Sequence, residues 1–423
     1  MVRPVLLACL VAWCCSGGAA QGSRVVEIEH ADSLVGRVIE GEEVRELIGN
    51  VRLRQERIVM ACDRALQYIA SGKVQLTGHV VVVDSNITMT APRGMFFRDD
   101  KRAEAYDDVV LDDGSVHLTA RAGEYFVNRR TAYFRDHVVV RDTGSVMSAD
   151  SLTYFRDEKR SIATGTVRLH HFRDNVTLYG GRVDHRSARQ YTKVTRDPVL
   201  VQIDSAAGGD RDTLIVRGIV MESFRDSVRR LIATDSVRIL RSTLSATCGI
   251  AVMYTDGDSL LLRTAPVVWY EQTQVTGDSI NVYLEHRRLR RVSVMGSAFA
   301  ASQEDSLRPD RFDQLSGETM QMYFAGRALH MIDVDTRATS VYYVYEGLSP
   351  NGLNKISGDR VLLTFDHGRI LDIRVYAGVQ GSYIPENLVS DRETEYALPG
   401  LHWRSRRPVM QTMLPARRGG FDW

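Results

Sequence analysis

Apolar and polar residues alternate along much of this chain, and between Gly49 and Leu169 the alternation returns with a fixed period of about 29 residues. Each period opens with a glycine or an aspartate, then a polar residue and a valine. The copies are Gly49-Asn50-Val51, Gly78-His79-Val80, Asp107-Asp108-Val109, Asp136-His137-Val138 and Gly165-Thr166-Val167. A repeat of this size predicts a stack of similar units, each of which buries its core against its neighbours.

Each period divides into two strands and two turns. The segment from Met147 to Phe155 mixes β-branched, small and aromatic residues, as strands do, and a polar turn follows at Arg156 to Arg160. The chain returns through Ala163 to Leu169 and reaches a second turn at Arg173-Asp174-Asn175. Equivalents of this second turn are Asp84-Ser85-Asn86, Asp112-Asp113-Gly114 and Asp142-Thr143-Gly144. Asp, Asn and Gly are the residues that tight turns need, so the pattern predicts hairpins.

Residues two apart in a strand point the same way, so the apolar positions of each repeat share one face. Their neighbours, such as Arg52 and Arg168, are mostly charged, which predicts a sheet with one apolar and one solvated face. The ten apolar positions are candidates for the lining of a continuous interior groove. They are Val51, Leu53, Val80, Val82, Val109, Leu111, Val138, Val140, Val167 and Leu169.

Beyond Leu169 the period loosens, but the segment of small and aromatic residues recurs. Its later copies are Leu214 to Phe224, Leu244 to Tyr254, Val275 to Tyr283, Leu315 to Tyr323 and Ile356 to Phe365. Together with the earlier copies they give about ten repeats of ~29–40 residues, hence roughly twenty strands. The predicted fold class is all-β, an elongated solenoid-like stack of antiparallel strands.

The two ends of the chain differ from the repeats. Residues 1–20 have Arg3, an apolar run and small residues before Gln21, which predicts a secretory signal peptide. Acylation at Cys9 stays open as an alternative. Residues 21–40 are expected to form an N-terminal edge segment, with Arg24 to Ile28 as its edge strand. Residues 386–423 carry several prolines and glycines, so we expect a poorly structured tail.

Composition excludes some function classes. The chain has 54 basic and 53 acidic residues intermixed along its length, so no nucleic-acid-binding patch is expected. Beyond the signal peptide only Cys62 and Cys248 remain, too few for a disulfide framework, and we expect two buried thiols.

Catalytic and metal-binding motifs are not found in the sequence. It has no Gly-rich phosphate loop, GxSxG, HExxH or CxxC motif. His170 and His171 are adjacent, but neighbouring strand residues point to opposite faces, so they are poorly placed to bind one metal ion. Aspartates recur at one repeat position, as at Asp63, Asp150, Asp184, Asp278 and Asp359, where we expect them to serve turn or ladder geometry. We therefore expect neither an enzyme nor a cofactor.

The repeats resemble a known family. The segments Val51 to Tyr68, Val80 to Phe96, Val109 to Tyr125 and Val138 to Tyr154 are similar to LptA/OstA-like periplasmic bridge proteins of Gram-negative bacteria. In that family a glycine or acidic residue and a valine open one strand, and a small residue and an aspartate precede an aromatic residue in the next. The resemblance divides the repeats into a regular set, residues 41–200, and a divergent set, residues 201–385.

The resemblance implies a β-jellyroll, open along one side, whose apolar interior carries the acyl chains of lipopolysaccharide through the periplasm towards the outer membrane. It also implies partners, namely other Lpt-type jellyroll domains that pair through edge strands, and head-to-tail self-association. Two alternatives stay open from the residues themselves. One is an exported β-solenoid scaffold or binding protein with a filled core and no lipid cargo. The other is a β-solenoid carbohydrate enzyme, which would need converging carboxylates on its outer face.

Overall fold

The computed structural model describes residues 26–205, 211–241, 244–254, 256–285, 288–303, 307–326, 328–347, 349–366 and 369–414. The expected signal peptide and Cys9 lie outside the described residues, as does part of the expected edge strand, Arg24 and Val25. The chain forms two compact units, unit 1 up to Asp107 and unit 2 from Asp108. Each unit is described by itself.

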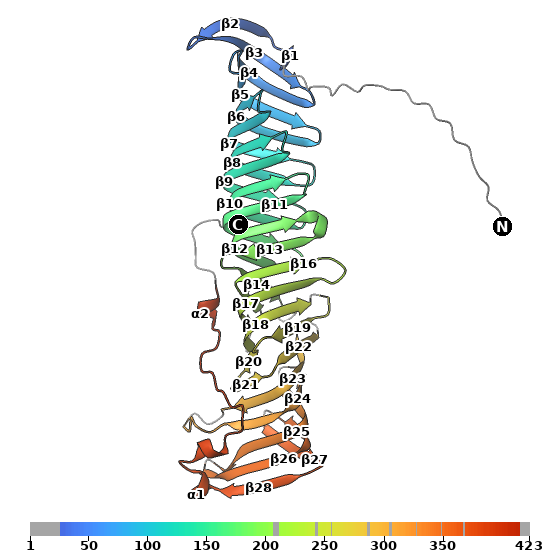
Figure 1. Cartoon of the computed structure of the whole chain (residues 1–423), viewed down its shortest axis with the longest axis vertical. Helices are drawn as coiled ribbons and strands as arrows, with labels where there is room; N and C mark the ends of the chain where they lie inside the picture. The colour runs from blue at the N-terminus through green and yellow to red at the C-terminus, as the bar shows by residue number, and fades with distance from the viewer. Residues whose placement is uncertain are drawn as a thin grey trace, which may run out of the picture. The chain divides into compact units, whose positions relative to one another are not determined.

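Unit 1 is an antiparallel sheet. Its strands are β1 (Glu27–His30), β2 (Ser33–Ile39), β3 (Glu42–Gln55), β4 (Ile58–Tyr68), β5 (Lys73–Asp84), β6 (Ile87–Phe97) and the first half of β7 (Arg102–Asp112). Strands β3 to β6 pair in chain order, and β1 and β2 both pair with β3, one with each half of it (Figure 1). In the described pairings β1 and β2 have no other neighbour, so the edge predicted at Arg24 to Ile28 includes β2 as well.

Unit 2 continues the same pattern of strands. They are β8 (His117–Phe126), β9 (Thr131–Arg141), β10 (Ser145–Phe155), β11 (Arg160–His171), β12 (Val176–Arg186), β13 (Tyr191–Thr195), β14 (Val199–Ser205), β15 (Arg211–Arg217), β16 (Val220–Phe224), β17 (Arg230–Arg241), β18 (Leu244–Tyr254), β19 (Ser259–Arg263), β20 (Val267–Tyr270), β21 (Thr273–Thr276), β22 (Ser279–Glu285), β23 (Arg288–Ser302), β24 (Asp313–Ala325), β25 (Ala328–Glu346), β26 (Ser349–Asp366), β27 (Arg369–Tyr376) and β28 (Gln380–Pro385). A 3-10 turn, Ser187–Arg189, lies between β12 and β13.

The all-β prediction and the predicted turns are confirmed. The described residues form 28 strands, more than the roughly twenty expected, because several long strands are broken in the middle. The break is a sharp bend, and the two halves of a strand belong to two different walls. Thus β13 pairs with the second half of β12 and with β16, whereas β14 pairs with the first half of β12 and with β15.

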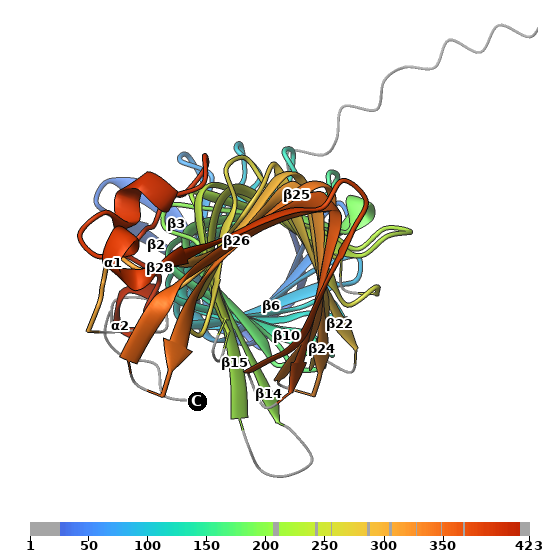
Figure 2. The ribbon, with the colours of Figure 1, turned by 90° about the horizontal axis from the view of Figure 1, so that it is seen from below.

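We call the wall that contains β13, β16, β19 and β22 the first wall of unit 2, and the wall that contains β14, β15, β20 and β21 the second wall. Figure 2 looks along the stack and shows the successive strands of unit 2 placed over one another. In unit 1 a bend of the same kind separates the two halves of β3, and we call the wall with β2 the first wall of unit 1 and the wall with β1 its second wall. The hairpin turns of each wall lie away from the bend, at the free edges of the walls.

The expectation of a poorly structured tail is wrong for residues 386–414, which we call the strap. The strap contains α1 (Glu386–Val389), a 3-10 turn (Glu393–Tyr396) and α2 (Met410–Met413). Its Val389 and Leu398 are buried against Phe299, Val341 and Leu353, among others. Prolines prevent the strap from pairing as a regular strand, yet its spaced apolar side chains still fix it on the second wall (Figure 1).

Polar contacts hold the middle of the strap. The side-chain amide of Gln274 donates to the carbonyl of His402 at 2.7 Å and accepts from the backbone N–H of Arg404 at 2.8 Å. The strap ends at Met413, which is fully buried beside Val199 and Ile215. The outer face of this stretch of the second wall is therefore covered.

The sequence contains a pattern that indicates a covered outer face. Strands of the second wall from β14 onward have apolar residues in succession, as in Leu214-Ile215-Val216 and Val267-Val268-Trp269. Continuous apolar runs are typical of strands buried on both faces, whereas one-sided strands alternate. These runs predict a covering segment, and residues 386–414 supply it.

Candidate functional site

The three residues that open each repeat form the bend between the walls. At Gly78 and His79 the backbone φ is +75° and +44°, a left-handed pair that lets the strand turn sharply. A Cβ at Gly78 would collide with the carboxylate of Asp63 on the neighbouring strand, so glycine is needed there for space as well as for φ.

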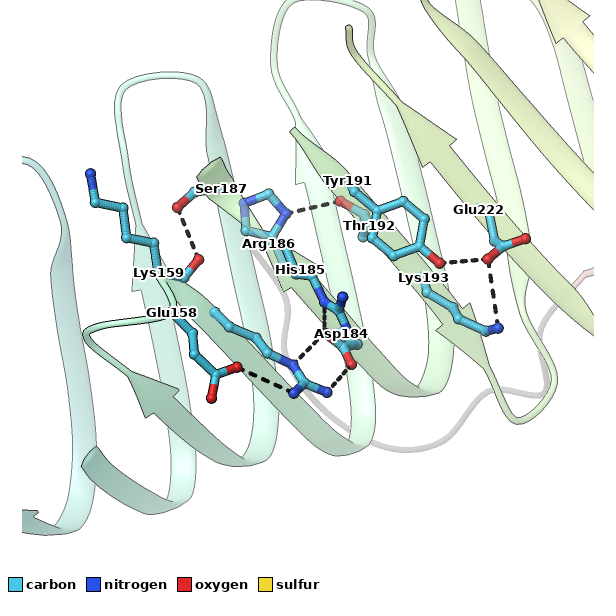
Figure 3. Close-up of polar contacts among 11 residues, drawn as sticks. Glu158, Lys159, Asp184, His185, Arg186, Ser187, Tyr191, Thr192, Lys193 and Glu222 are labelled. Atoms are coloured by element: carbon cyan, nitrogen blue, oxygen red, sulfur yellow. Dashed lines mark hydrogen bonds and ion pairs between the residues drawn. The ribbon is translucent and has the colours of Figure 1, made fainter. Parts of the chain in front are cut away.

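The recurrent aspartates hold these bends, as the sequence predicted. Oδ2 of Asp63 lies 2.8 Å from Nδ1 of His79, and Oδ2 of Asp150 accepts a hydrogen bond from the backbone N–H of Thr166 at 3.0 Å. Asp278 lies against Gly296 in the same way. Asp184 differs, because it forms an ion pair with Arg160, 2.6 Å away, on the outward face of the first wall (Figure 3).

In each unit the candidate positions lie on one face of that unit's second wall, which we call its inward face. In unit 1 these are Val51, Leu53, Val80 and Val82, and in unit 2 Val109, Leu111, Val138, Val140, Val167 and Leu169. Eight of them are at most 8% exposed, and Leu111 and Val140 are half-buried. The periodicity thus picks out core-facing residues, but burial alone does not separate lipid contacts from ordinary packing.

Sequence reasoning missed the partners of these residues on the intervening strands. Val82 of unit 1 lies opposite Met60 and Met89, and Leu169 of unit 2 lies opposite Met147 and Leu178. The signal that could have found them is their position two residues from the recurring small residue, such as Ala149. With them, the inward face is apolar on successive strands of each unit.

Close to the bend the two walls of unit 2 touch. Gly180 pairs with Val167 on the inward face, and a Cβ there would overlap Cγ1 of Val194 on the first wall. Glycine at this position allows the opposite valine to approach the backbone. The inner corner of the stack is therefore filled by side chains, and half-buried inward residues lie further from it.

Charged residues face each other at the free edges of the walls. In unit 1 Nζ of Lys101, after β6, lies 2.7 Å from Oε1 of Glu56, between β3 and β4. In unit 2 burial raises the pKa of Asp113, but hydrogen bonds from Ser115 and Val116 and the charge of Arg156 outweigh burial and leave it lowered. In unit 1 an ion pair therefore links a first-wall turn to a second-wall turn, and in unit 2 the charge of a first-wall turn acts on a carboxylate of a second-wall turn.

The remaining candidates for chemistry are explained by packing. His170 hydrogen-bonds Thr177 at 3.0 Å on the outward face, and His171 points inward, so the pair does not share a ligand. Among the described residues no group of three metal-ligating side chains converges. Cys62 and Cys248 are free and buried, and burial raises their pKa to about 11 and about 12.

No helix within the described ranges is long and apolar enough to cross a membrane.

Comparison with known proteins gives a match to a family model and matches to solved structures. Residues 23–137 match the family model described as OstA-like protein. A solved structure of LptH, the LptA-homologous periplasmic component of the lipopolysaccharide transport device of Pseudomonas aeruginosa, is 12% identical; the match covers 47% of this chain and 92% of that one, with a TM-score of 0.14. No curated protein matches the chain. The repeats that begin the chain, residues 23–137, are an OstA-like domain.

Proposed function

We propose that this protein is an exported carrier that binds the acyl chains of lipopolysaccharide and takes part in moving this glycolipid through the periplasm to the outer membrane. The observation that supports it most is the apolar inward face, which repeats on successive strands of a chain whose first repeats are OstA-like. The role needs no covalent step.

A face of this kind can hold acyl chains without any single decisive contact. Each buried methylene contributes about 0.8 kcal/mol, so several chains lying along the strands would be held firmly while they remain able to slide. The sugars and phosphates of the cargo would lie near the free edges of the walls.

The packing in the structure sets a condition on this proposal. Because the inner corner is filled, acyl chains would lie against the half-buried inward residues nearer the free edges, such as Leu111 and Val140. Loading would also require edge contacts such as Lys101 with Glu56 to part. The cost is small, because a partly exposed ion pair contributes about 0–1 kcal/mol.

Partners would bind at the terminal strands. In unit 1 β2 exposes Leu34, Val35 and Val38, and in unit 2 β27 exposes Leu371 at 70%. An edge strand with unpaired backbone groups and apolar side chains can receive a strand of another jellyroll domain or of a second copy. We propose such edge pairing as the route by which lipid passes between domains.

One observation favours a second candidate, the exported scaffold with a filled core. Eight of the ten candidate side chains are almost completely buried, as residues of an ordinary core are. In that case the outer face alone would bind partners, and no lipid would enter.

A binding experiment separates the two candidates. The full chain, freed of lipid, is titrated with fluorescently labelled lipopolysaccharide, and unlabelled lipopolysaccharide and its deacylated form are used as competitors. The carrier predicts competition by the acylated form alone. It also predicts that Leu111→Asp, on the inward face, weakens binding at least tenfold, whereas Val110→Asp, one residue away on the outward face, does not. A folded protein that binds no lipopolysaccharide would support the scaffold.

A further inference from the structure

One stretch of the inward face of unit 2 is polar. Counted from the bend, each strand of the first wall has a first and a second residue that point inward. The second is Tyr154 in β10 and Leu231 in β17, and the four strands between these two carry polar residues there. These are Ser161, His185, Thr192 and Ser223, which lie opposite one another in the sheet register. Together with His171 of the second wall we call them the polar belt.

The belt residues are hydrogen-bonding groups on the inward face of unit 2. Nδ1 of His185 lies 2.9 Å from Oγ1 of Thr192, and Figure 3 shows the two side chains pointing toward each other from β12 and β13. Their neighbours Asp184, Lys193 and Glu222 belong to the opposite, outward face, where they form ion pairs with Arg160 and with one another. The belt is thus separate from the outer ladder of charges.

Charged groups surround both imidazoles. Burial, followed by the charges of Arg225 and His185, lowers the pKa of His171 to about 4, although Asp142 and Asp174 act in the opposite direction. Burial and Arg225 also lower the pKa of His185, against Asp142 and Asp184. The same arginine therefore acts on one histidine from each wall. The backbone N–H of Arg225 donates to the carbonyl of Gln190 at 3.0 Å, so Arg225 lies beside the start of β13, the strand that carries Thr192.

We propose that the polar belt is a subsite for the phosphate of an acylated amphiphile, held by Arg225, the two histidines and the hydroxyl of Thr192. This inference rests on the proposed function and adds to it a position at which the headgroup of the cargo is bound. Hydroxyl, imidazole and guanidinium groups all donate hydrogen bonds to phosphate oxygens, and Arg225 supplies a permanent positive charge. A purely apolar cargo would gain nothing from four polar positions in succession, since each costs free energy when it faces hydrocarbon.

The proposal has a pH signature. Without a ligand both histidines are neutral at pH 7. A bound anion favours the protonated imidazole, so binding raises its pKa and takes up a proton. Affinity for an anion should therefore increase as the pH falls, by about tenfold between pH 7.5 and 5.5 for one imidazole that regains its ordinary pKa.

The test uses dihexanoyl phosphatidylglycerol, whose phosphodiester stays anionic over this range, and octyl glucoside, an uncharged amphiphile. Binding to the full chain is measured at pH 7.5 and 5.5 for the native protein, for His171→Gln and His185→Gln, and for His170→Gln as the matched control on the outward face. The imidazole proton resonances of His171 are followed by NMR as a function of pH, with and without phosphatidylglycerol. This titration measures the pKa of His171 directly in the native protein.

We expect phosphatidylglycerol to bind more tightly at pH 5.5 and to raise the pKa of His171, and octyl glucoside to bind equally at both pH values. The two inward variants should lose most of this pH dependence, and His170→Gln should keep it. Binding of both amphiphiles without any effect of pH or of the inward histidines would overturn the subsite and leave the carrier role intact. Binding of neither amphiphile would overturn both.

Discussion

Nη2 of Arg311 lies 2.7 Å from Oε1 of Glu386, and this ion pair joins the loop before β24 to the start of the strap. The Arg311 side chain is 3% exposed and also contacts Glu393 at 3.0 Å. Burial lowers the pKa of Arg311, but the hydrogen bonds that its guanidinium donates to Glu386 and Glu393 outweigh burial and raise the pKa well above its usual range. A buried guanidinium with two carboxylates fixes one position of the strap more strictly than apolar packing alone.

Replacement of this arginine should loosen the strap. Arg311→Leu leaves Glu386 and Glu393 beside each other without their cation, which we expect to cost about 3 kcal/mol, as removal of one partner from a buried pair does. Urea unfolding measures the loss, and limited proteolysis should show faster cleavage within residues 386–409. The control is Arg392→Leu, which removes an exposed ion pair with Glu395 and should change stability by less than about 1 kcal/mol. Equal effects of the two substitutions would contradict this account of the strap.

The far end of the strap depends on Met413. Its side chain is fully buried beside Val199 and Ile215, whereas Met410 on the same short helix is 45% exposed. Met413→Ala should therefore destabilise the attached strap by about 2–4 kcal/mol, and Met410→Ala should be nearly neutral. Amide hydrogen exchange of residues 405–414 measures how often this end of the strap detaches. If both variants exchange at the rate of the native protein, Met413 does not hold the strap in place.

The bends should not tolerate a side chain at their glycines. Gly165 has a φ of +96°, and an added Cβ would overlap the carboxylate of Asp150 that binds the amide of Thr166. We expect Gly165→Ala to lower the free energy of unfolding by about 1–3 kcal/mol, through backbone strain and loss of this hydrogen bond. Gly36 has open space around it and no positive φ, so Gly36→Ala should be tolerated. Thermal unfolding of the two variants decides the matter.

Stability should decrease in mild acid because of the inward histidine of the second wall. Burial, and then Arg225, lower the pKa of His171 to about 4, below the ordinary value of an unfolded chain. The unfolded state then binds a proton more readily, so this contribution is complete above about pH 6.5 and is lost as the pH falls towards 4. His171→Gln should flatten the dependence of unfolding free energy on pH in this window. An unchanged slope would show that His171 is not the responsible group.

The repeats could be predicted well because their physical cause is local. The three residues that open each repeat, such as Gly78-His79-Val80, provide the two residues of positive φ that form a bend and the first inward valine. Their fixed spacing therefore reveals where the strands lie and which face each side chain is on. The later bends were harder to find because the residues change, as at Arg196-Asp197 and Thr264-Ala265, while the positive φ pair persists. Conformation is conserved along the chain more strictly than residue type.

The strap and the polar belt could not be derived in the same way, because both depend on contacts distant in sequence. Gln274 binds residues around Arg404, and no local pattern in the strap specifies that partner. His171 and His185 belong to different walls, and only the bend brings their charges under the influence of Arg225. The sequence predicts that His170 and His171 lie on opposite faces, but the groups around His171 emerge only from the folded arrangement.

The most direct test of the carrier role compares two adjacent valines of β9. Val139 and Val140 are both half-buried, but Val140 lies on the inward face and Val139 on the outward face. A photoreactive residue is placed at each position in the full chain, the protein is incubated with lipopolysaccharide and irradiated, and adducts are detected by antibody after electrophoresis. The carrier predicts adducts from position 140 and none from position 139. Adducts from both positions alike, or from neither in a folded protein, would contradict an inward lipid site.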